Sequence, residues 1–72
     1  MNIKALSVEA RRKILERVKK KLSFTWALGV LDISRGAMYN YLHGLRGISD
    51  KVVYRALQFL EEREFSELDH TQ

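Results

Sequence analysis

A short chain without cysteine has few ways to stabilise a fold. This one has 72 residues and contains neither cysteine nor proline. Domains of this size bury only about 60% of the surface of the unfolded chain, and many depend on disulfides, a metal or oligomerisation. Disulfides are impossible here, and His43 and His70 lack the close spacing of zinc ligands. Regular helix packing remains, and we expect no metal and no cofactor.

Four serines, each placed just before an apolar segment, divide the chain. Serine is a favoured residue at the N-cap of a helix, and glycine is favoured just after its end. The apolar spacings between these residues predict helices over residues 8–21, 24–31, 35–43 and 50–65, followed by an acidic tail over residues 66–72. We therefore expect one all-α domain over residues 1–72, built from four or five helices.

The apolar residues of these helices predict which faces are buried. We expect the helix over residues 24–31 to be mostly buried, and Phe24, Trp26 and Tyr54 to be core residues rather than platforms for stacking nucleotides. In the fourth helix, a stripe at i, i+4 and i+7 should close over the other three. It comprises Val53, Leu57, Leu60 and Leu68 and is widened by Val52, Ala56 and Phe59. Gly36, inside the third helix, has two interpretations: tight packing of two helices, or close approach of the backbone to a ligand.

The net charge of +4 hides a polarised distribution. Residues 1–21 carry eight basic and two acidic side chains, whereas residues 61–72 carry one basic and five acidic side chains. A basic segment of this kind is typical of a surface for a polyanion, although a solvated helix face would look the same. No apolar run approaches the length of a membrane span, and the N-terminus lacks the apolar stretch of a signal peptide. We expect a cytoplasmic protein, without a membrane partner.

Residues 24–43 resemble the helix-turn-helix motif of DNA-binding proteins. Its buried positions fall on Ala27, Leu31, Ile33, Met38 and Tyr41. Two residues depart from the motif. Asp32 replaces the usual turn glycine, which is tolerable because aspartate adopts a left-handed conformation more readily than most residues. Leu28 stands where the family prefers alanine.

The segment after the motif extends the resemblance. The order Tyr41, Leu42, Gly44 and Arg46, followed by an apolar helix, is similar to domains of the Cro and lambda-repressor type, and the similarity covers about residues 7–62. The charged stretch at residues 7–13 and the acidic end also resemble the N-terminal domains of archaeal integrases, which are tyrosine recombinases. His43 and Arg46 share the spacing of the recombinase His-x-x-Arg box, but that assembly needs a far larger domain.

The resemblance implies that the third helix lies in the major groove of double-stranded DNA, associated with the nucleoid. The residues that it assigns to base reading are Arg35, Gly36, Tyr39 and Asn40. Arg35 would pair with guanine and Asn40 with adenine. The residues that it assigns to phosphates are Ser34, His43, Arg46, Lys51, Arg11, Arg12 and Lys13.

The residues leave more than one function open. The first hypothesis is sequence-specific DNA binding, by a transcriptional regulator or by the targeting module of a larger protein such as an integrase, with a homodimer or a longer parent chain supplying affinity. The second is a protein-interaction or oligomerisation module that uses the basic first helix and the apolar stripe of the fourth. We expect no enzyme and no small-molecule substrate, because the chain has no catalytic constellation and is too short to enclose a pocket.

Overall fold

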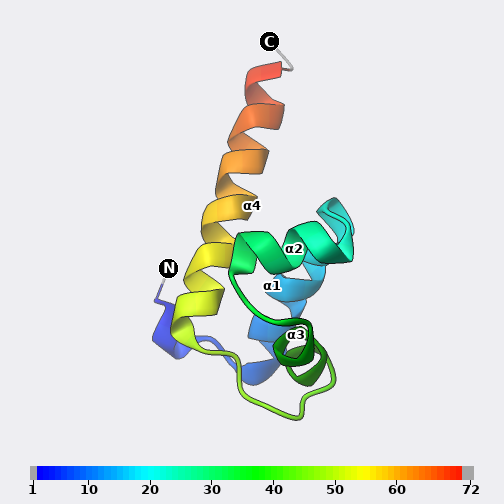
Figure 1. Ribbon diagram of the computed structural model, residues 1–72. Helices are drawn as coiled ribbons and strands as arrows, with labels where there is room; N and C mark the ends of the chain where they lie inside the picture. Colours follow the sequence, from blue (N-terminus) through cyan, green and yellow to red (C-terminus); the bar gives the residue numbers. More distant parts are fainter. Residues whose placement is uncertain (1, 71–72) are drawn as a thin grey trace.

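Four α-helices and one short 3-10 helix make up the described chain (Figure 1). The computed structural model describes residues 2–70 and the side chains of residues 2–61. The elements in chain order are η1 (Ile3–Ala5), α1 (Val8–Lys21), α2 (Phe24–Leu31), α3 (Arg35–Leu42) and α4 (Asp50–His70). The all-α fold with four α-helices predicted from the sequence is confirmed for these residues.

Serine hydroxyls cap the first turns of the helices, as predicted. The Ser7 hydroxyl accepts a hydrogen bond from the Ala10 N–H at 3.1 Å, and Ser34 accepts one from the Ala37 N–H at the same distance. Ser23 and Ser49 make the equivalent contacts at the starts of α2 and α4. Each cap satisfies a backbone donor that has no partner within its helix. The predicted starts of all four helices are confirmed, and the bounds of the elements also match the predicted ends of the first two.

Two residues with positive φ shape the ends of α2 and α3. Asp32 follows α2 with φ 55° and ψ 52°, a left-handed conformation, which aspartate adopts more readily than most residues. Gly44 has φ 71° and lies just after α3, which ends at Leu42, one residue earlier than predicted. Only residues 32–34 join α2 to α3.

The core is formed by apolar side chains from every α-helix and from the loop before α4. Four of the five buried positions expected from the motif are buried, and the fifth, Ile33, is partly buried and packs against them. The buried residues are Leu15, Val18, Ala27, Leu31, Met38, Tyr41, Ile48, Val52, Val53, Ala56 and Leu60. The stripe predicted on α4 thus packs on α1 and α2 within the same chain.

The prediction that Trp26 and Tyr54 are core residues is wrong. Trp26 is 71% exposed and Tyr54 is 55% exposed, while Phe24 is partly buried and contacts the core. The expectation that α2 is mostly buried is also wrong, because only Ala27 and Leu31 of that helix are fully buried. Trp26 is next to Ala27, so its side chain leaves the helix about 100° away from the buried side.

Helix α4 is longer than the sequence suggested. It continues to His70, five residues past the predicted end at residue 65, so an acidic tail beginning at residue 66 is not a separate segment. In Figure 1 the C-terminal part of α4, coloured orange to red, rises beyond the other helices. The side chain of Leu68 and residues 71–72, which the sequence placed in the stripe and the tail, lie outside the described residues. No helix within the described chain is long and apolar enough to span a membrane.

Candidate nucleic-acid interface

The exposed side of α3 carries a row of polar and aromatic side chains. Arg35, Tyr39 and His43 follow one another at intervals of four residues, which places them on one face of the helix and its cap. All three are exposed, whereas Met38 and Tyr41 point into the core. The rings of Tyr39 and His43 lie 4.0 Å apart between centroids, with planes inclined by 30°. The row therefore ends in a stacked aromatic pair.

A phenylalanine supports the first residue of this row. The guanidinium carbon of Arg35 lies 5.2 Å from the centroid of the Phe24 ring, and the Lys19 Nζ lies 6.0 Å from the same centroid. Both distances are within the range in which a cation is attracted to an aromatic face. Phe24 begins α2, and thus it joins a cation from α1 to a cation from α3. The contact with Phe24 helps to hold the Arg35 side chain in place at the N-terminal end of α3.

A groove runs beside the row, between α1 and α3. It has a volume of about 420 Å³ and is lined by Glu16, Lys19, Lys20, Leu42 and His43. The structure therefore brings two lysines of α1 next to the exposed face of α3. Sequence reasoning did not assign these lysines to the site, because basic residues in the last turn are explained by the helix dipole alone. The only sign in the sequence that Lys19 and Lys20 belong to a binding site was that they form a run of three lysines with Lys21.

Other predicted contacts surround the start and middle of α3. Ser34 is exposed, and its hydroxyl accepts the capping hydrogen bond from Ala37. A Cβ added to Gly36 would meet no atom within 4 Å, so tight packing of two helices does not explain this glycine. Its exposure is compatible with the second interpretation, close approach of a ligand. The Asn40 side chain belongs to a partly buried residue and is less accessible than that of Tyr39.

Two predicted phosphate contacts lie away from the groove. The guanidinium carbon of Arg46 is 5.9 Å from the ring centroid of Tyr41, in the loop after α3. Lys51 is at the start of α4 and lines a different hollow, of about 440 Å³, together with Asn2, Ile3 and Lys4. Neither residue lines the groove between α1 and α3. The predicted phosphate contacts are therefore not brought together at one place.

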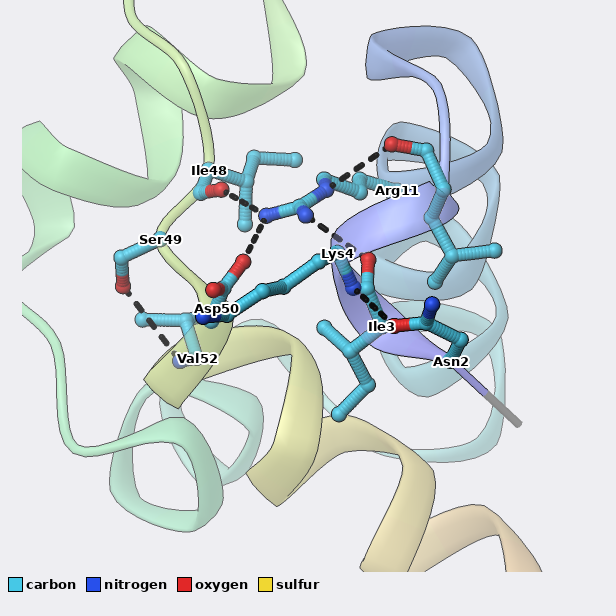
Figure 2. A network of polar contacts seen from close by, with 9 residues as sticks. Asn2, Ile3, Lys4, Arg11, Ile48, Ser49, Asp50 and Val52 are labelled. Carbon is cyan, nitrogen blue, oxygen red and sulfur yellow. Dashed lines mark hydrogen bonds and ion pairs between the residues drawn. The ribbon is translucent and has the colours of Figure 1, made fainter.

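Arg11 has a structural position that the sequence did not predict (Figure 2). Its guanidinium donates to the carbonyl oxygens of Ile3 and Ile48 at 2.8 Å and of Leu6 at 3.3 Å. It also forms an ion pair with Asp50, with 2.7 Å between nitrogen and oxygen. The side chain is only 13% exposed. Arg11 joins η1, the loop before α4 and the start of α4.

The neighbouring basic residues differ from Arg11. Arg12 forms an ion pair and hydrogen bond with Glu9, one turn earlier on α1. The hydrogen bond to Arg12, followed by its positive charge, lowers the pKa of Glu9, and the same two interactions with Glu9 raise the pKa of Arg12. Lys13 is exposed and does not line the groove. Of the three basic residues predicted to contact phosphates on α1, only Lys13 has no polar contact described here.

The described side chains contain no group of three or more histidine, aspartate or glutamate residues close enough to hold a metal ion. The candidate site consists of the exposed row of α3 together with the lysines of the adjoining groove.

No protein-family model, no curated protein and no solved structure matches the chain.

Proposed function

We propose that the chain binds double-stranded DNA, with the exposed face of α3 in the major groove. The observation that carries this proposal is the position of Lys19 and Lys20 beside the row formed by Arg35, Tyr39 and His43. A helix that offers hydrogen-bond donors along one face, next to cations on a second helix, has the chemistry to contact base edges and a phosphate backbone together. The proposal covers a transcriptional regulator and the targeting module of a larger DNA-processing protein, because both would use this surface.

Base reading is assigned first to Arg35. It is the first residue of α3, is exposed, and is supported by the ring of Phe24. The major groove is about 12 Å wide and admits an α-helix, and arginine pairs with guanine O6 and N7 through two hydrogen bonds. Gly36 and Tyr39 are exposed, follow Arg35 by one and four residues, and would lie against the same bases. Asn40 is partly buried and less accessible than Arg35, so its pairing with adenine is assigned after the contact made by Arg35.

Phosphate contacts are assigned to the groove and to the cap of α3. Lys19, Lys20 and His43 line the groove, and Ser34 lies at the N-terminus of α3, where backbone N–H groups are directed toward an anion. Glu16 lies in the same groove and would repel phosphate, so a DNA backbone would lie on the side of the lysines. Each neutralised phosphate contributes about −0.9 to the slope of log affinity against log salt. Three or four contacts would give a slope of about −3.

The apolar stripe of α4 gives little support to the alternative, an interaction module built on that stripe. Val52, Val53, Ala56 and Leu60 are buried within the chain's own core. A partner could reach these side chains only if the core opened. Of the basic residues of α1 that such a module would use, Arg11 makes internal contacts and Lys19 and Lys20 line the groove beside α3, whereas Lys13 is exposed outside the groove.

The test begins with selection of bound duplexes from a random pool, followed by titration of one selected duplex and one random duplex. We expect Arg35→Ala to weaken binding to the selected duplex by about 1–3 kcal/mol and to affect the random duplex far less. The double variant Lys19→Ala, Lys20→Ala should weaken both duplexes and reduce the salt slope by about 2. Anisotropy of a labelled duplex gives both quantities.

The matched control is Lys13→Ala, which removes one exposed cation from α1 outside the groove. It should reduce affinity much less than either change within the groove. Circular dichroism must show unchanged helix content for each variant. Unchanged binding by both the Arg35 variant and the lysine double variant would rule out this surface. An equal loss for Lys13→Ala would mean that net charge, and not the groove, determines binding.

A further inference from the structure

The outer face of α4 and η1 form a second surface, away from the groove between α1 and α3. Two hollows lie along it, with volumes of about 440 and 270 Å³, and both are lined by Ile3 and Tyr54. The first extends to Lys4 and Lys51 at the start of α4, and the second extends to Glu61. Because they share two lining residues, the two hollows adjoin each other.

Four residues on this face keep a regular register. Lys51, Tyr54, Gln58 and Glu61 follow one another at intervals of three, four and three residues, so they lie on one face of α4. All four are exposed, and they include the large aromatic side chain of Tyr54. The Gln58 amide donates a hydrogen bond to the Tyr54 hydroxyl at 3.4 Å. Side chains at these intervals lie on the same side of the helix, so one neighbouring helix could contact all four.

Charge is segregated along the same face. The end near η1 holds Lys4, Lys51 and Asp50, and the Asp50 carboxylate is paired with Arg11, so this end keeps a positive charge; the acidic end begins at Glu61. At 1.5 Å per residue, Lys51 and Glu61 are about 15 Å apart along the axis. In the sequence, residues 62–70 of α4 add four acidic residues and one basic residue. The helix is therefore positive near its start and negative toward its C-terminal end, as a self-complementary surface requires.

We infer that this surface binds a second copy of the chain, with the two α4 helices antiparallel. In this arrangement Lys51 lies opposite Glu61 of the second copy, and Tyr54 lies opposite Gln58. A two-fold axis makes each contact occur twice, so both ends of the surface are matched at once. A parallel arrangement would instead place lysine opposite lysine and glutamate opposite glutamate. Charge complementarity therefore selects both the occupant and its direction.

The position of α4 in the fold leaves room for this partner. Lys51, Tyr54, Gln58 and Glu61 are all exposed, so a second helix can lie along residues 51–61 of α4, whereas the C-terminal part of α4 extends beyond α1, α2 and α3 (Figure 1). The residues that form the core are on other faces of α4, and the hydrophobic core of each copy would stay intact. The inference does not rest on DNA binding, because none of the residues in this surface lines the groove beside α3.

Sedimentation equilibrium without DNA tests the inference, at chain concentrations from about 10 μM to 1 mM. We expect a monomer–dimer equilibrium that weakens as salt is raised. Lys51→Glu and Glu61→Lys should each weaken the dimer by about tenfold or more, because each reversal acts at two places. When the two variants are mixed, opposite charges face each other again, and the heterodimer should be as stable as the wild-type dimer.

Lys13→Glu is the control, since it makes the same charge change as Lys51→Glu on an exposed lysine of α1. Its dimer should match the wild type, and its heterodimer with Glu61→Lys should be weaker than the heterodimer of Lys51→Glu with Glu61→Lys. Circular dichroism must show that each variant is helical. A wild-type chain that stays monomeric at 1 mM, or a mixture that does not recover, would overturn the inference. Both results leave the DNA-binding proposal standing.

Discussion

Replacing Arg11 by alanine should destabilise the fold by about 3 kcal/mol. The guanidinium donates to three carbonyl oxygens, at 2.8, 2.8 and 3.3 Å, and all three carbonyls belong to segments outside α1. A hydrogen bond from a charged group contributes about 1.5–3 kcal/mol. Water can reach the carbonyls once the side chain is removed, so we assign about 1 kcal/mol to each bond. A loss of this size is a large fraction of the stability of a small domain.

The ion pair with Asp50 makes a smaller contribution, because the Asp50 side chain is 49% exposed. Asp50→Ala should therefore destabilise by only about 1 kcal/mol, including the loss of a favourable charge in the first turn of α4. Arg11→Lys keeps the charge but reaches fewer carbonyls, and its effect should lie between the other two. Urea unfolding followed by circular dichroism at 222 nm gives the three free energies.

Lys13→Ala is the reference for this series, since exposed substitutions usually change stability by no more than about 0.5 kcal/mol. If Arg11→Ala and Asp50→Ala lower the free energy of unfolding equally, the ion pair and not the carbonyl contacts connects these segments. A loss below about 1 kcal/mol for Arg11→Ala would show that the contacts in Figure 2 contribute little to folding.

Three further changes test single residues. Gly36→Ala should raise the free energy of unfolding by about 0.5–1 kcal/mol, because a Cβ meets no neighbour there; weaker DNA binding by the same stabilised variant would indicate close approach of the ligand. Gly44→Ala should lower it by about 1 kcal/mol, because φ is 71° at that position, and an unchanged urea midpoint would contradict this. Arg12 holds the pKa of Glu9 below its usual value, so the contribution of this pair to stability is present at neutral pH and is lost as the pH falls below about 4. Glu9→Gln should flatten that part of the acid unfolding curve, and an NMR titration of the Glu9 carboxyl that shows no lowered pKa would refute the assignment.

Helix boundaries were accessible from the sequence because they depend on local chemistry. A serine hydroxyl reaches a backbone N–H only three residues away, so Ser7 and Ser34 could be identified without knowledge of the tertiary fold. The positive φ of Gly44 and Asp32 is also a local property of those residues. The end of α4 was harder to predict, because its acidic last turns are intrinsically compatible with both a helix and a tail.

Side-chain direction and distant partners were less accessible. Seven of the eight residues of α2 are apolar or glycine, so periodicity could not identify the exposed side on which Trp26 lies. The exposure of Tyr54 could have been predicted from the stripe on α4, since Tyr54 lies outside the register of Val53, Ala56 and Leu60. Arg11 could not be placed, because its main-chain partner Ile48 is 37 residues away and offers no distinctive side chain. The role of Lys19 and Lys20 in the groove could not be identified without knowing that α1 packs against α3.

The exposed Trp26 gives this protein an unusual spectroscopic property. It is the single tryptophan of the sequence, and 71% of it is already in contact with solvent in the folded state. Its intrinsic emission should therefore change little when the chain unfolds, although the helices are lost. A molecule that covers the outer side of α2 would instead shift the emission to shorter wavelength. Tryptophan emission thus reports occupancy of that side of α2 almost independently of unfolding, which is the reverse of its behaviour in a protein with a buried indole.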